Sequence, residues 1–244
     1  MSASSKDLYD FLGTKYLELD LYRGDDMDVV HEAIAVTRAT TILDAGCGPG
    51  QHVKECARLP YVERVVGVDF SPGMIKAAHR NLRGAAKGTH TILAVDDFLR
   101  PTKRFGQFDV ALCMNNALGN ALSENLPQAA GDRRRAVQNL SACLKPGGAL
   151  VVSVYLHEYM PLDYMYGKHS AFSVAEESDI DAGDLVIQYT PSPSSSFHYY
   201  SHWFRRKELE HLLEASGIRI VRKVCRPPRL IAVCRAPIDT DNGG

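Results

Sequence analysis

The sequence lacks the long apolar segment that a membrane-spanning helix requires. No run of about 18 apolar residues occurs in the chain. The first residues, MSASSKDLYDF, are polar and contain no apolar stretch of the kind found in a secretion signal. We therefore expect the protein to reside in the cytoplasm and to have no membrane partner.

The sequence also lacks an excess of positive charge. Its 28 lysines and arginines are balanced by 29 aspartates and glutamates, which gives a formal net charge of −1. No global positive field would draw such a protein to a polyanion. We expect no nucleic-acid partner.

Cysteine pairs at metal or redox spacing are missing too. The chain has six cysteines, but it contains no C-x-x-C pair and no His/Cys cluster at metal-ligand spacing. This pattern predicts reduced, mostly buried thiols and no metal site. The cysteines are Cys47, Cys56, Cys113, Cys143, Cys225 and Cys234.

The hydrophobic content of 45% is sufficient for one large core. Short β-branched runs alternate with longer amphipathic segments from Thr41 onward, which is typical of parallel strands joined by crossover helices. We predict an α/β fold with a seven-stranded, mostly parallel sheet and helices on both faces. The expected strands are 41–45, 63–68, 91–95, 108–114, 148–155, 218–225 and 229–235, and the expected helices are 51–58, 73–83, 131–144 and 205–217, after two leading helices within 6–38.

Residues 156–204 interrupt this alternation with a stretch rich in Tyr, His, Ser and Pro. We interpret them as an inserted cap, in which 185–190 and 197–204 alternate well enough to be two antiparallel strands. The core is then 1–155 together with 205–236, and 237–244 is expected to be a flexible tail.

A glycine-rich turn follows the first expected strand, in the segment TTILDAGCGPGQHV. The strand ends at Asp44 and Ala45, and Gly46, Gly48 and Gly50 lead into a helix. Bare backbone and a helix N-terminus at the carboxyl end of a strand form a seat for a ligand.

Asp44 distinguishes two cofactors that such a turn could hold. A carboxylate at this position suits a ligand with an α-ammonium group, such as S-adenosylmethionine, and would repel a pyrophosphate. The glycines also depart from the G-x-G-x-x-G pattern of nicotinamide enzymes, because the third comes one residue early. A nicotinamide-dependent oxidoreductase remains an alternative from another class.

The ends of the next strands carry further candidate cofactor contacts. Asp69 could accept hydrogen bonds from both ribose hydroxyls, and Phe70 and Met74 could cover one face of an adenine. Asp97, or its neighbour Asp96, could accept the exocyclic amine of the adenine.

Three more candidate contacts come from the third and fourth strand ends. Phe98 could lie beside the adenine ring, and Asn115 and Asn116 follow the fourth strand above the glycine turn. The acid Asp109 opens the fourth strand and is interpreted as structural. DRRR at 132–135 is interpreted as a solvated helix face.

Five segments in this order and spacing resemble motifs I to V of the class I S-adenosylmethionine-dependent methyltransferases. They are LDAGCGPG, VVGVDFSPGMI, DDF, FDVALCMNNALG and LKPGGALVVSVY, and the match covers roughly residues 40 to 155. The region from CMNNALGN to VYLHEY further resembles the glycine N-methyltransferase type. In that type an asparagine at the position of Asn116 contacts the amine substrate, and an arginine grips the substrate carboxylate where this chain has Tyr155. The resemblance also implies that the leading segment with Tyr22 closes over the cofactor.

We therefore predict a methyltransferase that uses S-adenosylmethionine, releases S-adenosylhomocysteine and methylates a small molecule, most plausibly at an amine nitrogen. The candidate acceptor-site residues are Asn116, Tyr155, His157 and His198. O-methylation is the alternative, and it would need a base such as His157, His198 or His202. A non-catalytic cofactor-binding module is a further alternative. The oligomeric state stays open, with a homodimer possible.

Overall fold

The computed structural model describes residues 5–13, 26–84, 88–121, 126–160, 172–179 and 183–238. Its main sheet has the seven strands predicted from the sequence, and their order is β3-β2-β1-β4-β5-β10-β9. The strands are β1 (Thr41–Ala45), β2 (Arg64–Asp69), β3 (His90–Val95), β4 (Phe108–Cys113), β5 (Leu144–Tyr155), β9 (Arg219–Arg226) and β10 (Arg229–Arg235). Only β10 is antiparallel to its two neighbours, β5 and β9.

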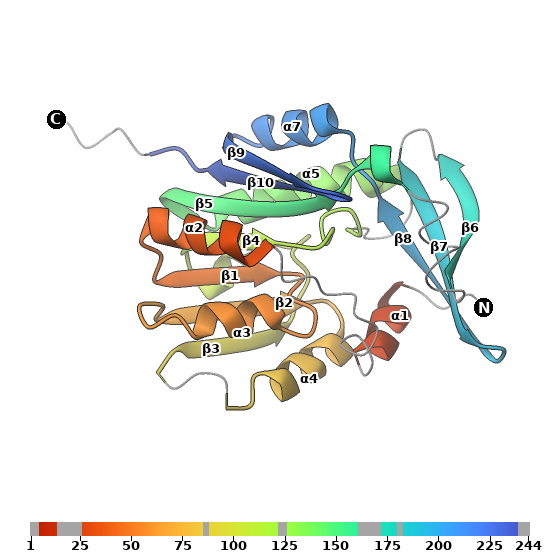
Figure 1. Ribbon diagram of the computed structural model, residues 1–244, viewed down its shortest axis with the longest axis horizontal. Coiled ribbons are helices and arrows are strands. Elements are labelled where there is room, and N and C mark those ends of the chain that lie inside the picture. The colour runs from red at the N-terminus through yellow and green to blue at the C-terminus, as the bar shows by residue number, and fades with distance from the viewer. Residues whose placement is uncertain are drawn as a thin grey trace.

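Helices cover both faces of this sheet (Figure 1). On one face, α2 (Met27–Thr37) and α3 (Gln51–Ala57) bury apolar side chains against β1, β2 and β4. On the other face, α5 (Ala129–Ala142) and α7 (Arg206–Glu214) pack on the alternate residues of β4, β5 and β10. Strands that are covered on both sides must be apolar throughout, which explains their nearly continuous β-branched runs.

The parallel strands all end at one edge of the sheet, on the right in Figure 1. Their carboxyl ends face α1 (Ser5–Leu12) and a second, three-stranded sheet. At this edge the chain order reverses between β1 and β4, and α/β proteins bind ligands at such a point. The fold therefore brings the candidate residues of the glycine turn, Asp69, Asp97 and Asn116 to the same edge.

The second sheet confirms strand pairing in the inserted segment and adds one strand. It consists of β6 (Phe172–Asp179), β7 (Asp184–Ser192) and β8 (Ser195–His202), all antiparallel. The sequence predicted strands close to β7 and β8 but not β6. The β7–β8 hairpin turns at Pro193 and Ser194, within a Ser/Pro-rich part of the inserted segment. We call β6–β8 the cap.

Helix α1 lies across the beginning of α4 (Pro72–Asn81). The carboxylate of Asp10 accepts hydrogen bonds from the Ser71 hydroxyl (2.6 Å) and from the backbone N–H of Gly73 (2.9 Å). A Cβ atom on Gly73 would lie 2.4 Å from the backbone oxygen of Asp10, so only glycine permits this approach. The first helix is thereby fixed beside the carboxyl end of β2.

The cysteine side chains agree with the expectation of reduced, mostly buried thiols, and two element boundaries differ from those predicted. All six thiols are free, and only Cys225 is exposed. The described residues contain no helix that could cross a membrane and no group of three or more potential metal ligands. Helix α5 begins two residues earlier than predicted, and β5 begins at Leu144 rather than 148.

Candidate functional site

The glycine turn after β1 offers one open backbone surface. Gly46, Gly48 and Gly50 all have left-handed backbone conformations, with φ angles of 74°, 50° and 78°. A Cβ atom on Gly46 would lie 2.8 Å from the Cβ of Ala117, whereas one on Gly48 would meet nothing within 4 Å. Ala45, before the turn, is fully buried. The free space beside the turn is therefore at Gly48.

Asp44 brings an unpaired carboxylate oxygen to this edge. Its side chain is buried, and its Oδ2 atom has no hydrogen-bond partner in the described part of the chain. Burial raises the pKa of Asp44 to about 6. Leaving a buried carboxylate oxygen unpaired is costly, and a ligand that brings a proton donor would relieve that cost.

A polar network that no sequence pattern indicates lies beside Asp44. The His52 ring (Nε2) is 3.2 Å from Asp26, and the guanidinium of Arg229 is 3.2 Å from the other oxygen of Asp26. Arg229 also donates to Asn115 over 2.9 Å. Burial alone would lower the pKa of His52, but the hydrogen bond with Asp26 and the charge of Asp44 raise it overall. These residues come from four distant segments, so no local pattern could reveal them.

Asp69 joins the glycine turn to the start of α4. One carboxylate oxygen accepts from the backbone N–H of Gly48 (2.8 Å) and the other from that of Ser71 (2.9 Å). Burial nevertheless raises the pKa of Asp69 to about 6. Each oxygen of an ionised carboxylate can accept a second hydrogen bond, so both retain capacity for a ribose hydroxyl.

The residues expected around an adenine gather next to Asp69. Phe70 contacts the ring of Tyr9 edge-on, with centroids 5.5 Å apart, and Met74 is buried against Leu8 and Leu12 of α1. Phe98 is also buried, and an atom of its ring would lie 3.4 Å from a Cβ atom built on Gly46.

Of the two neighbouring acids after β3, the structure favours Asp97 for a ligand contact. Asp96 is paired with Arg104 at 2.8 Å. Among the described residues, the carboxylate of Asp97 accepts one hydrogen bond, from the backbone N–H of Leu99 in its own turn (2.9 Å). Burial raises the pKa of Asp97.

Asn116 occupies a different position from the one expected of a substrate contact. Its side chain is fully buried. Its Oδ1 accepts from the backbone N–H of Tyr155 (3.1 Å), and its Nδ2 donates to the Ser201 hydroxyl and the His202 backbone oxygen, both at 3.2 Å. The amide therefore joins the end of β5 to the end of β8.

The other candidate acceptor residues are divided between two places. The ring of Tyr155 packs on that of Trp203, with centroids 4.9 Å apart, at the junction of β5 and the cap. His198 pairs with Gln188 in the cap and lies, by strand alternation, on the sheet face opposite Tyr199. His157 lies in the short turn after β5. Tyr22 falls outside the described residues.

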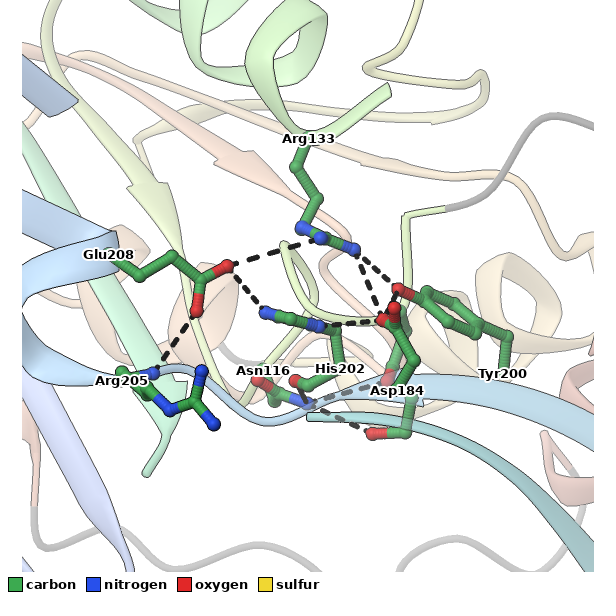
Figure 2. A network of polar contacts seen from close by, with 9 residues as sticks. Asn116, Arg133, Asp184, Tyr200, His202, Arg205 and Glu208 are labelled. Carbon is green, nitrogen blue, oxygen red and sulfur yellow. Dashed lines mark hydrogen bonds and ion pairs between the residues drawn. The ribbon is translucent and has the colours of Figure 1, made fainter. Parts of the chain in front are cut away.

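Figure 2 shows a cluster of charged and polar side chains between the cap and the core. Each ring nitrogen of His202 lies 2.7 Å from a carboxylate, that of Asp184 in the cap and that of Glu208 in α7. Arg133 of α5 contacts both carboxylates, at 3.6 and 4.0 Å, and the hydroxyl of Tyr200. Burial alone would raise the pKa of Asp184, but the hydrogen bonds from His202 and Tyr200 lower it overall. We call these five residues the cap anchor.

The cap anchor overturns one expectation from the sequence. Within DRRR, Arg134 and Arg135 are exposed, but Asp132 and Arg133 are buried. Asp109 agrees with its structural interpretation, because it accepts from the backbone of Thr40 and Thr41 and pairs with Lys145 at 2.8 Å.

Comparisons with known proteins agree with this arrangement. Residues 42–148 match a family model described as a methyltransferase domain. The chain is 26% identical over 186 residues to a glycine/sarcosine/dimethylglycine N-methyltransferase of Actinopolyspora halophila, a match that covers 73% of this chain and 31% of that protein. It is also 26% identical over 180 residues to a ubiquinone biosynthesis O-methyltransferase of Coxiella burnetii, covering 74% of this chain and 64% of that protein. The chain thus matches about a third of the length of the first relative and about two thirds of the length of the second.

The fold has close counterparts among solved structures. The CcbJ methyltransferase from Streptomyces caelestis superposes with a TM-score of 0.71 at 18% sequence identity, covering 93% of this chain and 96% of that one. The ordered motifs, the strand order, the matching family model and these relatives together support a class I S-adenosylmethionine-dependent methyltransferase.

Proposed function

We propose that the protein transfers a methyl group from S-adenosylmethionine to a small-molecule acceptor, at an amine nitrogen. The observation that carries this proposal is the unpaired, buried Oδ2 of Asp44 beside the open backbone of Gly48. An α-ammonium group supplies the proton donor that Asp44 lacks. A pyrophosphate would instead place negative charge against a buried carboxylate, which argues against a nicotinamide cofactor.

The remaining parts of the cofactor have suitable partners along the same edge. Asp69 has capacity for ribose hydroxyls, and the apolar side chains of Met74 and Phe98 suit an adenine. Asp97 is available for the exocyclic amine. We propose that these residues together hold the donor.

The chemistry requires little of the protein beyond positioning. When bound, S-adenosylmethionine supplies an already activated methyl group. Holding the acceptor in line with such a group contributes up to roughly 7–11 kcal/mol toward the barrier. We propose that α1 and the cap exclude water from this edge, and that Asn116 is a positioning residue that fixes the end of β5 against the cap.

Nitrogen is favoured over oxygen as the acceptor atom because a hydroxyl acceptor more often needs a general base. Among the described residues, the ring of His202 is already engaged by Asp184 and Glu208, and His198 lies on the cap face opposite Tyr199. The similarity to an N-methyltransferase supports the same choice. Similarity to an O-methyltransferase keeps oxygen as the second candidate.

Turnover of labelled donor with a panel of amines, phenols and carboxylates tests the proposal. We expect transfer to at least one amine and binding of S-adenosylhomocysteine without binding of NAD. Transfer only to phenols or carboxylates would contradict the choice of nitrogen. Binding of S-adenosylhomocysteine with no transfer to any acceptor would instead indicate a cofactor-binding module.

A further inference from the structure

Trp203 is the single tryptophan of the chain, and it follows the last residue of β8. Only 4% of its surface is exposed. Its indole nitrogen, Nε1, is buried and has no hydrogen-bond partner in the regions that the structure defines. An indole nitrogen can only donate, and a buried donor without an acceptor costs about 1–3 kcal/mol. The native protein therefore has a reason to keep this donor available.

The unpaired indole lies where an acceptor molecule is expected. Its ring packs on Tyr155 at the carboxyl end of β5, with centroids 4.9 Å apart and planes tilted by 46°. Ser153 lies two residues earlier, on the same face of the sheet as Tyr155. The Ser153 hydroxyl is a second buried group without a partner in the described part of the chain. The Trp203 indole nitrogen and the Ser153 hydroxyl are thus two buried polar groups without a described partner in the neighbourhood of Tyr155.

The same sheet face leads toward the proposed donor site. Strand alternation places Asp44 with Ile42 on the face covered by α2 and α3, and it places Ser153 with Val151 on that face too. The order β1-β4-β5 separates the two residues by a single strand. Ser153 therefore lies on the same sheet face as Asp44, the carboxylate that we assign to the donor, and Trp203 lies beyond Ser153, next to Tyr155.

The surroundings of Trp203 indicate what kind of ligand atom it pairs with. On the face of β7 and β8 that packs on α1 and Tyr155 the alternating residues are uncharged. They are Leu185, Ile187, Tyr189, Phe197, Tyr199 and Ser201, and Trp203 follows β8. The cation opposite Tyr155 on β10, Arg229, already contacts Asp26 at 3.2 Å. A carboxylate buried here would have no balancing charge among the described residues, and that is costly.

We infer that Trp203 determines acceptor specificity by donating its indole N–H to an uncharged oxygen, such as an amide or ketone carbonyl, of the methyl acceptor. The ring of Tyr155 contacts the body of the same molecule. The acceptor class is accordingly an amine that also carries a neutral hydrogen-bond-accepting oxygen. This inference rests on the proposed function, because it places the acceptor next to a bound methyl donor.

Because the chain has one tryptophan, its fluorescence reports on this site alone. The experiment uses the full chain saturated with S-adenosylhomocysteine, whose binding is first established by calorimetry. Two sets of three probes are then titrated: ethylamine, glycinamide and glycine, and benzylamine, 4-(aminomethyl)benzamide and 4-(aminomethyl)benzoate. Within each set, one scaffold carries in turn no oxygen-containing group, a neutral amide and a carboxylate. We expect the neutral amide of at least one set to bind at least tenfold more tightly than its two companions and to change the emission.

Removing the donor tests the role of the indole directly. In Trp203→Phe we expect the amide preference measured by calorimetry to fall at least tenfold, with the affinity for S-adenosylhomocysteine unchanged within twofold. Global replacement of tryptophan by its benzothienyl analogue provides a second variant, because it exchanges one N–H for sulfur in a ring of nearly the same shape. The same loss is expected there even if Trp203→Phe folds poorly.

Three outcomes would overturn the inference while the proposed function stands: normal binding of S-adenosylhomocysteine with no probe bound, tighter binding of a carboxylate or an oxygen-free amine, or an amide preference that survives in the benzothienyl protein. Failure of S-adenosylhomocysteine to bind would instead contradict the proposed function itself.

Discussion

Asn116 and Ser201 meet across the junction of the main sheet and the cap, with the amide Nδ2 donating to the serine hydroxyl over 3.2 Å. The same amide group holds the backbone of Tyr155 and His202. The loop after β4, the end of β5 and the end of β8 are therefore fixed relative to one another by one side chain. Any acceptor held against Tyr155 depends on this junction.

Replacing Asn116 tests the junction. Asn116→Ala leaves the Tyr155 N–H and the His202 oxygen without their partner, so we expect a loss of about 2–3 kcal/mol in stability. Methyl transfer should fall by at least tenfold, since a displacement of about 1 Å can cost roughly 10²-fold. The affinity for S-adenosylhomocysteine should change by less than about 1 kcal/mol if the donor site is separate.

Ser201→Ala is the matched control for this variant, because it removes only one of the four hydrogen bonds of the Asn116 side chain. Its effects should be smaller in both denaturation and turnover. A loss of cofactor affinity as large as the loss of turnover in Asn116→Ala would show that the junction belongs to the donor site.

The glycine turn can be tested by comparing two open, left-handed glycines. Gly48→Ala and Gly84→Ala both place a methyl group in free space at positive φ, so each should destabilise the fold by about 1–2 kcal/mol. Only Gly48 adjoins the proposed cofactor. We expect calorimetry to show weaker binding of S-adenosylhomocysteine, by at least tenfold, in Gly48→Ala alone. Equal affinities in the two variants would remove the turn from the binding site.

Gly46 would be a poorer choice for this experiment. A Cβ atom there would collide with Ala117 at 2.8 Å, so the fold and the binding site would change together.

Cofactor affinity should fall in acid. The pKa values of Asp44 and Asp69 are raised to about 6, so both carboxylates are ionised at pH 7 and become protonated between pH 7 and 5. A protonated Asp44 no longer attracts an ammonium group, so affinity is retained above about pH 7 and lost below about pH 6. Calorimetry with S-adenosylhomocysteine should show a decrease of about tenfold per carboxylate between pH 7 and 5.

Asp44→Asn is the control for the titration. It should bind more weakly at pH 7 and show a shallower decline in acid, since one of the two titrating groups is gone. Affinity that stays constant from pH 7 to 5 in the unmodified protein would contradict the assignment of these carboxylates to the site.

The cap anchor should contribute substantially to stability. Arg133→Met leaves the partly exposed carboxylates of Asp184 and Glu208 with His202 as their remaining partner, and we expect a loss of about 1–3 kcal/mol in stability. Arg134→Met, on the exposed side of the same helix, should change stability by no more than about 0.5 kcal/mol. Chemical denaturation of both variants checks this, and similar midpoints would mean that the cluster does not hold the cap.

The sequence predicted the central strands of the main sheet well because they are buried on both faces and their apolar runs are visible locally. Strand β6 was missed because its sequence, FSVAEESD, carries three acids and no clear alternation. Arg133 was misjudged because its charge is compensated by residues about 50 to 75 positions away, which no helical pattern reveals. Gly73 could be recognised as a helix start, but its second role beneath α1 depends on tertiary packing.

The central claim is that the carboxyl edge of β1 and β2 binds S-adenosylmethionine, and Asp69 tests it most directly. Asp69→Ala removes the group that connects Gly48, Ser71 and the proposed ribose. Calorimetry with S-adenosylhomocysteine should show a loss of about 2–3 kcal/mol in binding. Asp109→Ala, at the opposite end of the sheet, should bind with unchanged affinity. An unchanged dissociation constant in a folded Asp69→Ala protein would contradict the account.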